Sequence, residues 1–144
     1  VLRLGLGVTA FRASSERGAY EINLPWTAPP LSLNHRRHWR ANAALVRAVR
    51  DATCVLAKQA GIGPCPRVRV TLHYRPRDRR VRDEDNPLPT AKACFDGLVD
   101  AGIVPDDSPE FMVKDMPVLH EAASTAGLVP RLWLVVEPLW EVPA

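Results

Sequence analysis

"RVRVTLHYR", residues 67–75, alternates apolar and polar side chains without a break. Because successive side chains of a β-strand point to opposite faces of a sheet, this pattern predicts a strand with one buried face. The face predicted to be buried carries Val68, Val70, Leu72 and Tyr74. The other face carries three arginines, a threonine and a histidine, so we expect the outer side of this strand to be basic.

One helix is predicted before this strand and one after it. Residues 41–60 carry apolar side chains at helical spacing, and a glycine follows them as a natural stop. In the second case Pro87 and Pro89 place the helix start near Thr90, because proline is tolerated in the first turn of a helix but not further inside. Gly102 ends that helix, and both helices are amphipathic.

Three further strands complete the predicted fold. Apolar residues at every second position predict a strand over residues 20–26. Residues 113–119 predict another, although Pro117 shortens it or confines it to a sheet edge, because proline has no N–H to donate. A final strand is predicted over residues 131–138.

The predicted order of elements is therefore β-α-β-α-β-β, with a turn at residues 124–127 joining the last two strands as a hairpin. We expect an α+β fold of two layers, in which a mixed four-stranded sheet carries both helices on one face. The uncovered face is then polar, or buried against a partner. The length of 144 residues fits one domain, predicted over residues 19–144. Residues 1–18 are expected to be an N-terminal extension, either dispensable and disordered or forming a short extra strand.

The cysteines and the apolar segments bear on the compartment. The three cysteines include no CxxC pair, which argues against a disulfide framework or a zinc knuckle. No apolar segment reaches the length of a transmembrane helix, so a membrane is not an expected partner. The first residues faintly resemble a signal peptide, but Arg12 and the missing cleavage site argue against one. We expect a reducing, cytoplasmic setting.

The charges of the chain fall into two blocks of opposite sign. From Arg36 to Arg82 there are thirteen Arg or Lys residues and two acids, whereas from Asp83 to Glu121 there are ten acids and two lysines. Sixteen of the nineteen basic residues are arginine, which suits bidentate contact with phosphate. A polyanion bound by the first block and divalent cations bound by the second would account for both. The alternative, which charge clustering alone favours, is two solvated faces that pair with each other or with a second subunit.

The candidate catalytic groups lie in "RDEDNPLPTAKACFDGLVDAGIVPDD", residues 82–107. Asp83 and Asp85 are two residues apart in an extended segment, so their carboxylates should project to the same side. Asp107 follows the predicted helix. If the chain returns there to the end of the sheet, three carboxylates form an oxygen site for Mg²⁺ or Mn²⁺ with open positions for water and phosphate.

Lys92, in the first turn of the helix, could then reach a phosphate oxygen or the leaving group. Each of these groups also has a plainer interpretation. Lys92 could form a surface pair with Asp96, four residues later. The first acidic pair could balance the arginines before it, and Asp106 and Asp107 could belong to an ordinary turn.

This stretch resembles the signature of the RusA-type Holliday-junction resolvases, with its Asp-x-Asp-Asn, a lysine on the next helix, "DGL", "AG" and a closing Asp-Asp. The segment "INLPWTAPPLSLNHRRHWR", residues 22–40, is similar to that family's opening strand, Pro-rich loop, asparagine and basic cluster. With the final strands, the resemblance spans residues 20–140. It implies a homodimeric, Mg²⁺-dependent endonuclease, bacterial or phage-encoded, that resolves four-way DNA junctions by paired nicks.

The resemblance also implies roles for single residues. Asp83, Asp85 and Asp107 match the three essential metal-binding aspartates of the family, and Lys92 matches its catalytic lysine. In the shortest members the lysine follows the asparagine after two residues, whereas here five intervene. The difference is close to one helical turn, so Lys92 can present its amine on the same side.

Other positions are implied to support the site or to bind DNA. Asn86 matches the motif asparagine, in a supporting role, and Asp106 is a further candidate ligand. Asn34, Arg36 and Arg37 match the family's opening loop, and the resemblance implies that they contact DNA or the dimer partner. The residues predicted to bind DNA are Arg79, Arg80, Arg82, Asn34, Arg36 and Arg37.

We therefore predict a Mg²⁺-dependent endodeoxyribonuclease, with Mn²⁺ as a substitute, that acts on branched DNA in recombination and repair. Two alternatives stay open. One is a module that binds branched DNA without cutting it, and the other is an enzyme that acts on other branched or flap DNA.

Overall fold

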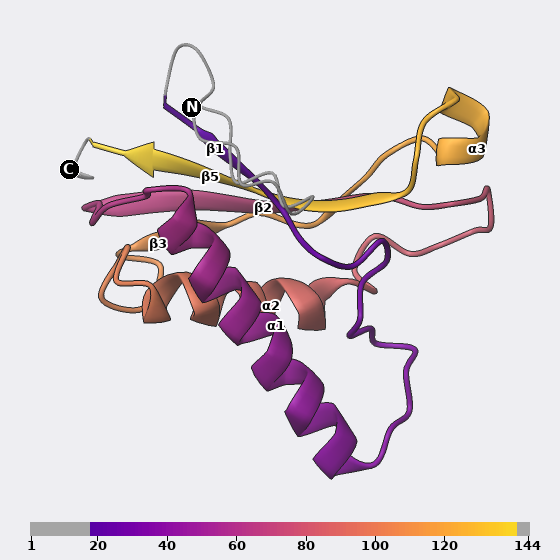
Figure 1. The fold of residues 1–144 in the computed structure, drawn as a ribbon, viewed down its shortest axis with the longest axis horizontal. Coiled ribbons are helices and arrows are strands. Elements are labelled where there is room, and N and C mark those ends of the chain that lie inside the picture. Colours follow the sequence, from indigo (N-terminus) through magenta and orange to yellow (C-terminus); the bar gives the residue numbers. More distant parts are fainter. Residues whose placement is uncertain (1–17, 141–144) are drawn as a thin grey trace.

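Strand β2 (Arg67–Arg75) lies inside a mixed sheet in the computed structural model, which describes residues 18–140 (Figure 1). Its bounds are those predicted from the alternation of its side chains. Of the predicted extension, residues 1–18, only Gly18 falls within the described part. The elements follow one another as β1 (Tyr20–Asn23), α1 (Trp39–Gln59), β2, α2 (Leu88–Asp100), β3 (Met112–Lys114), β4 (Val118–Leu119), α3 (Ala123–Ala126) and β5 (Arg131–Leu139).

The last strand lies between β1 and β2, so the predicted hairpin was wrong. β5 runs antiparallel to both neighbours, and its Leu134 stands opposite Ile22 on one side and Leu72 on the other. β3 and β4 lie across β2 from it. A nine-residue strand can pair along both edges in this position, whereas β3 and β4 would have offered it only three and two residues. The predicted turn is the short helix α3, which ends at Gly127 with a φ of 68°.

The strand predicted over residues 113–119 is divided into β3 and β4. The break includes Pro117, so the predicted weakening at this proline is confirmed. Both pieces pair in parallel with β2, with Met112 opposite Val68 and Val118 opposite His73. The sheet therefore has five strands instead of the predicted four. The predicted α+β class and mixed sheet are confirmed.

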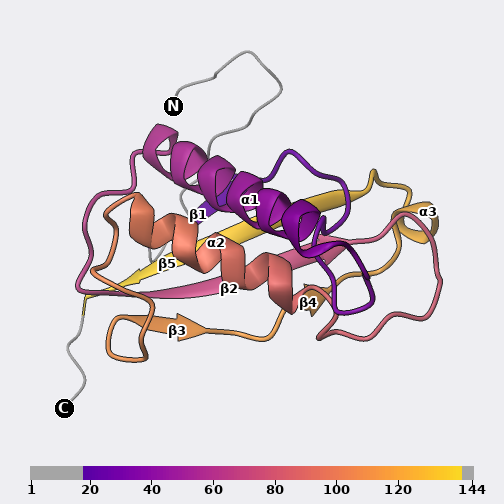
Figure 2. The same ribbon diagram turned by 90° about the horizontal axis from the view of Figure 1, so that it is seen from below.

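Both long helices cover the same face of the sheet, as predicted (Figures 1 and 2). Each begins and ends within two residues of its predicted bounds. The helices approach closely at Gly97 of α2, where a Cβ would lie 2.5 Å from the carbonyl oxygen of Arg50. Between helices and sheet lies the core, which includes Val49 and Leu98 of the helices and Val70 of β2.

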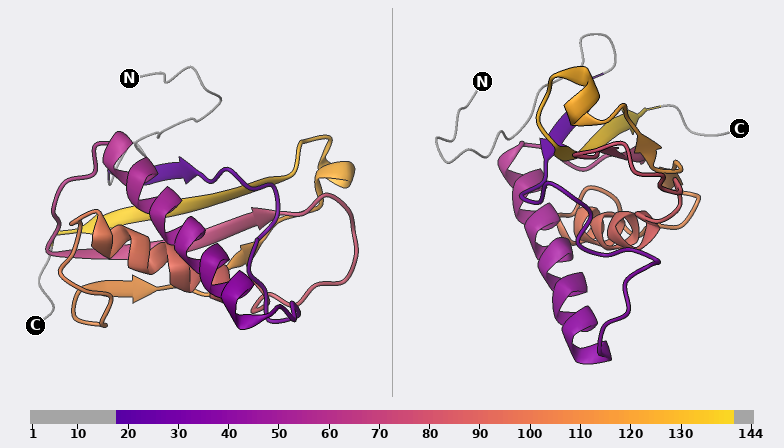
Figure 3. Two further views of the ribbon diagram at one scale, coloured as in Figure 1. Left: turned by 60° about the horizontal axis from the view of Figure 1, so that its bottom comes forward. Right: turned by 90° about the vertical axis from the view of Figure 1, so that its right-hand side faces the viewer.

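The first half of α1 projects away from the sheet (Figures 1 and 3). Residues 39–44 are all exposed, and Val49 is the first buried residue of this helix. No helix within residues 18–140 combines the length and the apolar character needed to cross a membrane.

The face of the sheet opposite α1 and α2 is polar and basic, as predicted for β2. At its centre the indole of Trp133 stacks on the His73 ring, with 5.1 Å between centroids, and the guanidinium of Arg131 lies 4.2 Å from the indole centroid. Nδ1 of His73 lies 2.9 Å from Nε2 of His120. Burial and the positive charge of His120 lower the pKa of His73 to about 4.

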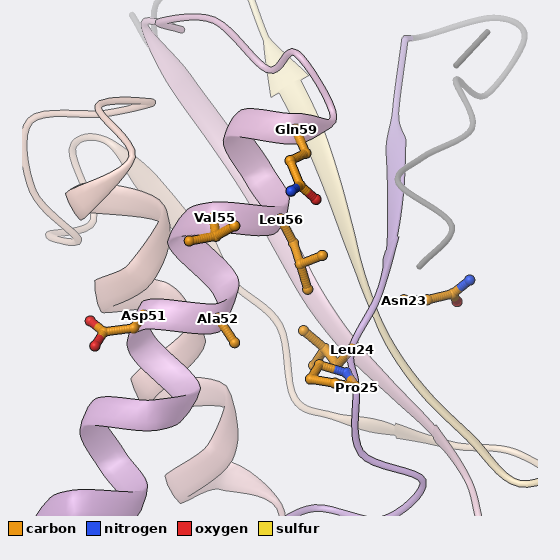
Figure 4. A pocket seen from close by; sticks show the side chains of 8 residues that line it. All are labelled: Asn23, Leu24, Pro25, Asp51, Ala52, Val55, Leu56 and Gln59. Carbon is orange, nitrogen blue, oxygen red and sulfur yellow. The ribbon is translucent and has the colours of Figure 1, made fainter. Parts of the chain in front are cut away.

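A groove of about 390 Å³ opens between the end of β1 and the second half of α1 (Figure 4). Its lining is mostly apolar and includes Leu24, Val55 and Leu56. It contains none of the predicted site residues, so it is separate from the candidate site.

Candidate functional site

The Pro-rich opening loop is fastened to the start of α2 by Thr90. The hydroxyl of this fully buried residue donates to the carbonyl of Leu31 over 2.6 Å and accepts from the N–H of Leu31 over 3.0 Å. A second bond joins the same segments, from the N–H of Leu33 to the carbonyl of Asn86 over 3.1 Å. The basic loop and the acidic stretch, far apart in the sequence, are thereby held side by side.

A hollow of about 340 Å³ lies where these segments meet. Five of the predicted site residues contribute to its lining: Asn34, Arg80, Arg82, Asp83 and Asn86. Three of the six residues predicted to bind DNA, Asn34, Arg80 and Arg82, therefore share one surface with Asp83, the first predicted metal ligand.

The arginine run before the acidic stretch is organised around Asp78. The carboxylate of Asp78 lies 2.9 Å from the guanidinium of Arg82, 3.4 Å from that of Arg80 and 3.7 Å from that of Arg77. Arg82 also donates to the carbonyls of Asp78 and Arg80, so much of its hydrogen-bonding capacity is used within its own loop. Its hydrogen bond holds the pKa of Asp78 below the usual value. The plainer hypothesis, that Asp83 and Asp85 balance these arginines, finds no support in the ion pairs of residues 18–140.

The other arginines predicted to bind DNA differ in whether their guanidinium groups already have hydrogen-bond partners. Arg37 donates to the carbonyl of Pro30 over 3.2 Å and lies 2.9 Å from Nδ1 of His35. Arg36 and Arg79 are exposed, and neither forms a hydrogen bond or ion pair with the residues that the structure describes. Their guanidinium groups can therefore meet phosphate without first breaking a contact.

Asp83 and Asp85 form the turns that lead into α2. The carbonyl of Asp83 accepts the N–H of Asn86 over 3.2 Å, and the carbonyl of Asp85 accepts the N–H of Leu88 over 3.0 Å. Both side chains are exposed, and within the described part of the chain neither carboxylate has a hydrogen-bond or ion-pair partner. Both are free to bind a cation.

A carboxylate held by two lysines lies beside α2. The ammonium of Lys92 donates to Oδ2 of Asp107 over 2.6 Å, and that of Lys114, at the end of β3, donates to the same oxygen over 3.1 Å. The bond from Lys92 holds the pKa of Asp107 below its usual value, and the bond to Asp107 raises the pKa of Lys92. The chain that leaves α2 therefore returns to this helix at Lys92.

Lys114 was not among the predicted site residues. It is one of only two lysines in the acidic block from Asp83 to Glu121, and this scarcity is the signal that could have identified it. Its ammonium also lies 5.7 Å from the centre of the Phe95 ring. The Lys114 side chain is 34% exposed and that of Lys92 59%, so Lys114 is the more firmly packed of the two.

The two aspartates after α2 have different surroundings. Oδ1 of Asp106 accepts the N–H of Ser108 over 2.6 Å, and the hydrogen bonds from the side chain and the N–H of Ser108 lower the pKa of Asp106. The turn hypothesis therefore describes Asp106, whereas Asp107 faces the lysines. The predicted surface pair of Lys92 with Asp96 is also present, at 3.2 Å.

The predicted ligands have the chemistry of a magnesium site but are not gathered into one. Carboxylate oxygens are the donors that Mg²⁺ prefers. No group of three or more His, Cys, Asp or Glu side chains in residues 18–140 is arranged to hold a metal ion. Asp85 lies three residues before the start of α2, whereas Lys92 lies four residues into the helix, about 6 Å along its axis. Because like-charged carboxylates repel one another, gathering them requires a cation between them. The three-aspartate site stays a prediction.

Comparisons with known proteins add one relative and no activity. No family model matches the chain. The chain is 32% identical over 114 residues to a protein of Xylella fastidiosa (strain Temecula1), and the match covers 75% of this chain and 71% of the relative. That protein bears the name "Uncharacterized protein".

Proposed function

Since this chain belongs to the same family as the Xylella fastidiosa protein, whose name states no activity, we propose its function from its own residues: a Mg²⁺-dependent endodeoxyribonuclease. It resolves Holliday junctions, four-way branched DNA, by paired phosphodiester cleavage in recombination and repair. It acts in the cytoplasm as a homodimer, because two symmetry-related centres suit a substrate that is cut twice. The motifs of residues 82–107 and 22–40, which resemble those of the RusA-type resolvases, are the starting point.

The contact between Lys92 and Asp107 is the observation that carries the proposal. A lysine and an aspartate matched to catalytic positions, 15 residues apart, meet at 2.6 Å. The segment with Asp83 and Asp85 enters the same helix, and the arginine-bearing loops join its start through Thr90 and Asn86. Segments that carry arginines and segments that carry aspartates thus meet near the start of α2, and this arrangement supports the proposal.

In the proposed reaction, each group of the chain has a distinct task. Asp83, Asp85 and Asp107 would hold Mg²⁺, which when bound supplies Lewis-acid activation of water and neutralisation of phosphate charge. The ammonium of Lys92 stabilises negative charge that develops on the phosphodiester in the transition state. Lys114 keeps the Asp107 carboxylate in place, because it holds Oδ2 from the sheet side.

The arginines supply binding that depends on salt concentration and little on sequence. Arg36 and Arg79, which are exposed and unpaired within residues 18–140, are the first candidates for phosphate contact. Arg80 lies at the hollow beside Asp83 and can direct a phosphate towards the acidic groups.

A cleavage assay with a matched pair of variants tests the proposal. A labelled four-way junction is incubated with Mg²⁺ and wild-type protein, Asp85→Asn or Glu84→Gln. We expect paired nicks from the wild type, a loss on the order of a hundredfold for Asp85→Asn, and activity within about twofold for Glu84→Gln, which removes the same charge one residue away. Asp85→Asn should still bind the junction. Equal cutting by wild type and Asp85→Asn would exclude this site.

A module that binds branched DNA without cutting it is the alternative function. It is favoured by the separation of Asp107 from the first acidic pair, because no three-carboxylate group is assembled within residues 18–140. Wild-type protein that binds the junction but never cuts it, with Mg²⁺ or with Mn²⁺, would establish this alternative.

A further inference from the structure

The N-terminal end, or tip, of α1 carries a large aromatic side chain that is not part of the core. Trp39, the first residue of the helix, is 68% exposed, and Leu33 in the preceding loop is 57% exposed. Residues 39–44 at this end of the helix are all exposed, and the first residues of the helix that pack against the core are Leu45 and Val46. Figure 3 shows the same end reaching beyond the rest of the molecule.

Positive charge surrounds the indole. The guanidinium of Arg40 lies 5.1 Å from the centre of the Trp39 ring, and the His38 ring stacks on it at 5.7 Å. Arg36 belongs to the same segment, and no acid occurs between residues 22 and 50. A flat apolar ring among guanidinium groups suits nucleic acid, because arginine contacts phosphates while an aromatic ring stacks on bases.

A second copy of this chain is a poorer occupant of the same tip. In a two-fold symmetric contact centred on this tip, the arginines of one tip would meet those of the other. Like charges brought together in this way oppose association. Charge complementarity therefore favours a polyanion.

We propose that Trp39 stacks on the open face of a base pair at the branch point of DNA, with Arg36 and Arg40 on the adjoining phosphates. In a continuous duplex every internal base pair is stacked on both sides, so an inserted ring must first separate two of them. At an open branch point, where the arms are not stacked on one another, a base pair has one free face at no such cost. Trp39 is therefore the residue that makes the protein prefer branched to continuous DNA. This inference rests on the proposed function for its ligand, DNA, but not on cleavage.

The experiment measures binding in EDTA, so that cleavage has no influence. A four-way junction and a continuous duplex, both with hairpin-capped ends that leave no other open base pair, are titrated with the full chain by fluorescence anisotropy. For Trp39→Ala we expect the dissociation constant to rise about tenfold for the junction and to stay within about twofold for the duplex. Trp39→Phe should retain most of the junction affinity. Trp140→Ala, at a residue that follows β5 and is 65% exposed, should change neither constant.

Three results with the Trp39→Ala variant would overturn the inference. Trp39→Ala could weaken both DNAs equally or neither, or it could lower the molecular mass in gel filtration, which would make Trp39 a contact between protein subunits. Wild-type protein that binds the junction but does not cut it with Mg²⁺ would end the endonuclease proposal and leave this one standing. Wild-type protein that binds neither DNA would end both.

Discussion

The ammonium of Lys92 lies 2.6 Å from Oδ2 of Asp107, although the two residues belong to a helix and to the loop after it. Lys114 reaches the same oxygen from β3. One carboxylate is thus shared by two of the three lysines of the chain. The third, Lys58, is exposed on α1 and provides a natural control.

Replacing each lysine by methionine in turn should separate the roles of these ammonium groups. Lys92→Met should lower junction cleavage on the order of a hundredfold, because in the proposed reaction it removes the ammonium that stabilises negative charge on the phosphodiester. Lys114→Met should cost about tenfold, since it acts only through Asp107. Lys58→Met should stay within about twofold. Equal losses for Lys58→Met and Lys92→Met would mean that general charge, and not this site, is being measured.

The same three variants should change the free energy of unfolding by no more than about 1 kcal/mol, because ion pairs this exposed contribute little. Urea unfolding of each variant checks this. A larger change for Lys114→Met would show that its loss of activity reflects unfolding.

Thr90→Val should destabilise the protein by about 2 to 4 kcal/mol. The substitution preserves shape but leaves the N–H and the carbonyl of Leu31 without their partner in a buried position. Thr90→Ser keeps the hydroxyl and should recover most of the stability. Thr53→Val, at a second buried threonine whose hydroxyl donates to the carbonyl of Val49 in its own helix and is also hydrogen-bonded to Cys94, leaves no backbone N–H without its partner and should cost less. Chemical unfolding of the three variants measures these differences. Equal costs at both threonines would contradict a special role for the two hydrogen bonds between Thr90 and Leu31.

Gly97→Ala should destabilise the pair of long helices by about 1 to 3 kcal/mol or more. The new methyl group would lie 2.5 Å from the carbonyl oxygen of Arg50 and 2.8 Å from Cβ of Thr53, so the helices have to move apart. Gly63→Ala meets open space at an ordinary backbone conformation and should be neutral or slightly stabilising. Melting temperatures of the two variants suffice for the comparison. A Gly97→Ala protein as stable as Gly63→Ala would exclude a tight crossing.

Stability should fall as the pH drops through the range where histidine titrates. Burial, His120 and Arg131 lower the pKa of His73 to about 4, and burial and the nearby arginines lower that of His120. A lowered histidine pKa means that the unfolded chain binds more protons, so stability is complete above about pH 6.5 and is lost between there and about pH 4. Because both rings are partly solvated, we expect a total loss on the order of 1 to 2 kcal/mol.

Urea unfolding at pH 7.5 and pH 5, followed by the fluorescence of the protein, measures this loss. The aspartates with lowered pKa, such as Asp78, act in the same direction but at lower pH. Replacing His73 and His120 by glutamine should therefore flatten the change between these two values. A wild-type stability that does not vary between them would contradict the prediction.

Features that depend on neighbouring residues alone were predictable. The alternation of residues 67–75 predicts the buried and exposed faces of β2, since side-chain direction follows from strand geometry. Helical spacing with a following glycine placed α1 within two residues, and prolines with a following glycine placed α2 equally well. Pro117 predicted the weak point that separates β3 from β4. The abrupt change of charge sign between Arg82 and Asp83 was also visible in the sequence.

Contacts between segments far apart in the chain could not be predicted from local sequence patterns. The position of β5 between β1 and β2 depends on which partner pairs with most of its backbone, and no local pattern records that choice. Thr90 has an ordinary helical neighbourhood in the sequence, and its partner Leu31 is 59 residues away. Lys114 and Asp107 meet because the loop after α2 turns back towards the sheet.

Sequence thus established the fold class, the two charged blocks and the residue types of the candidate site, because propensity and periodicity are local. The folded chain established which charges meet. Asp78 holds the arginines, two lysines hold Asp107, and Asp83 and Asp85 remain unpaired within residues 18–140. Electrostatic partners are set by distance in space, and folding alone brings such groups within reach of one another.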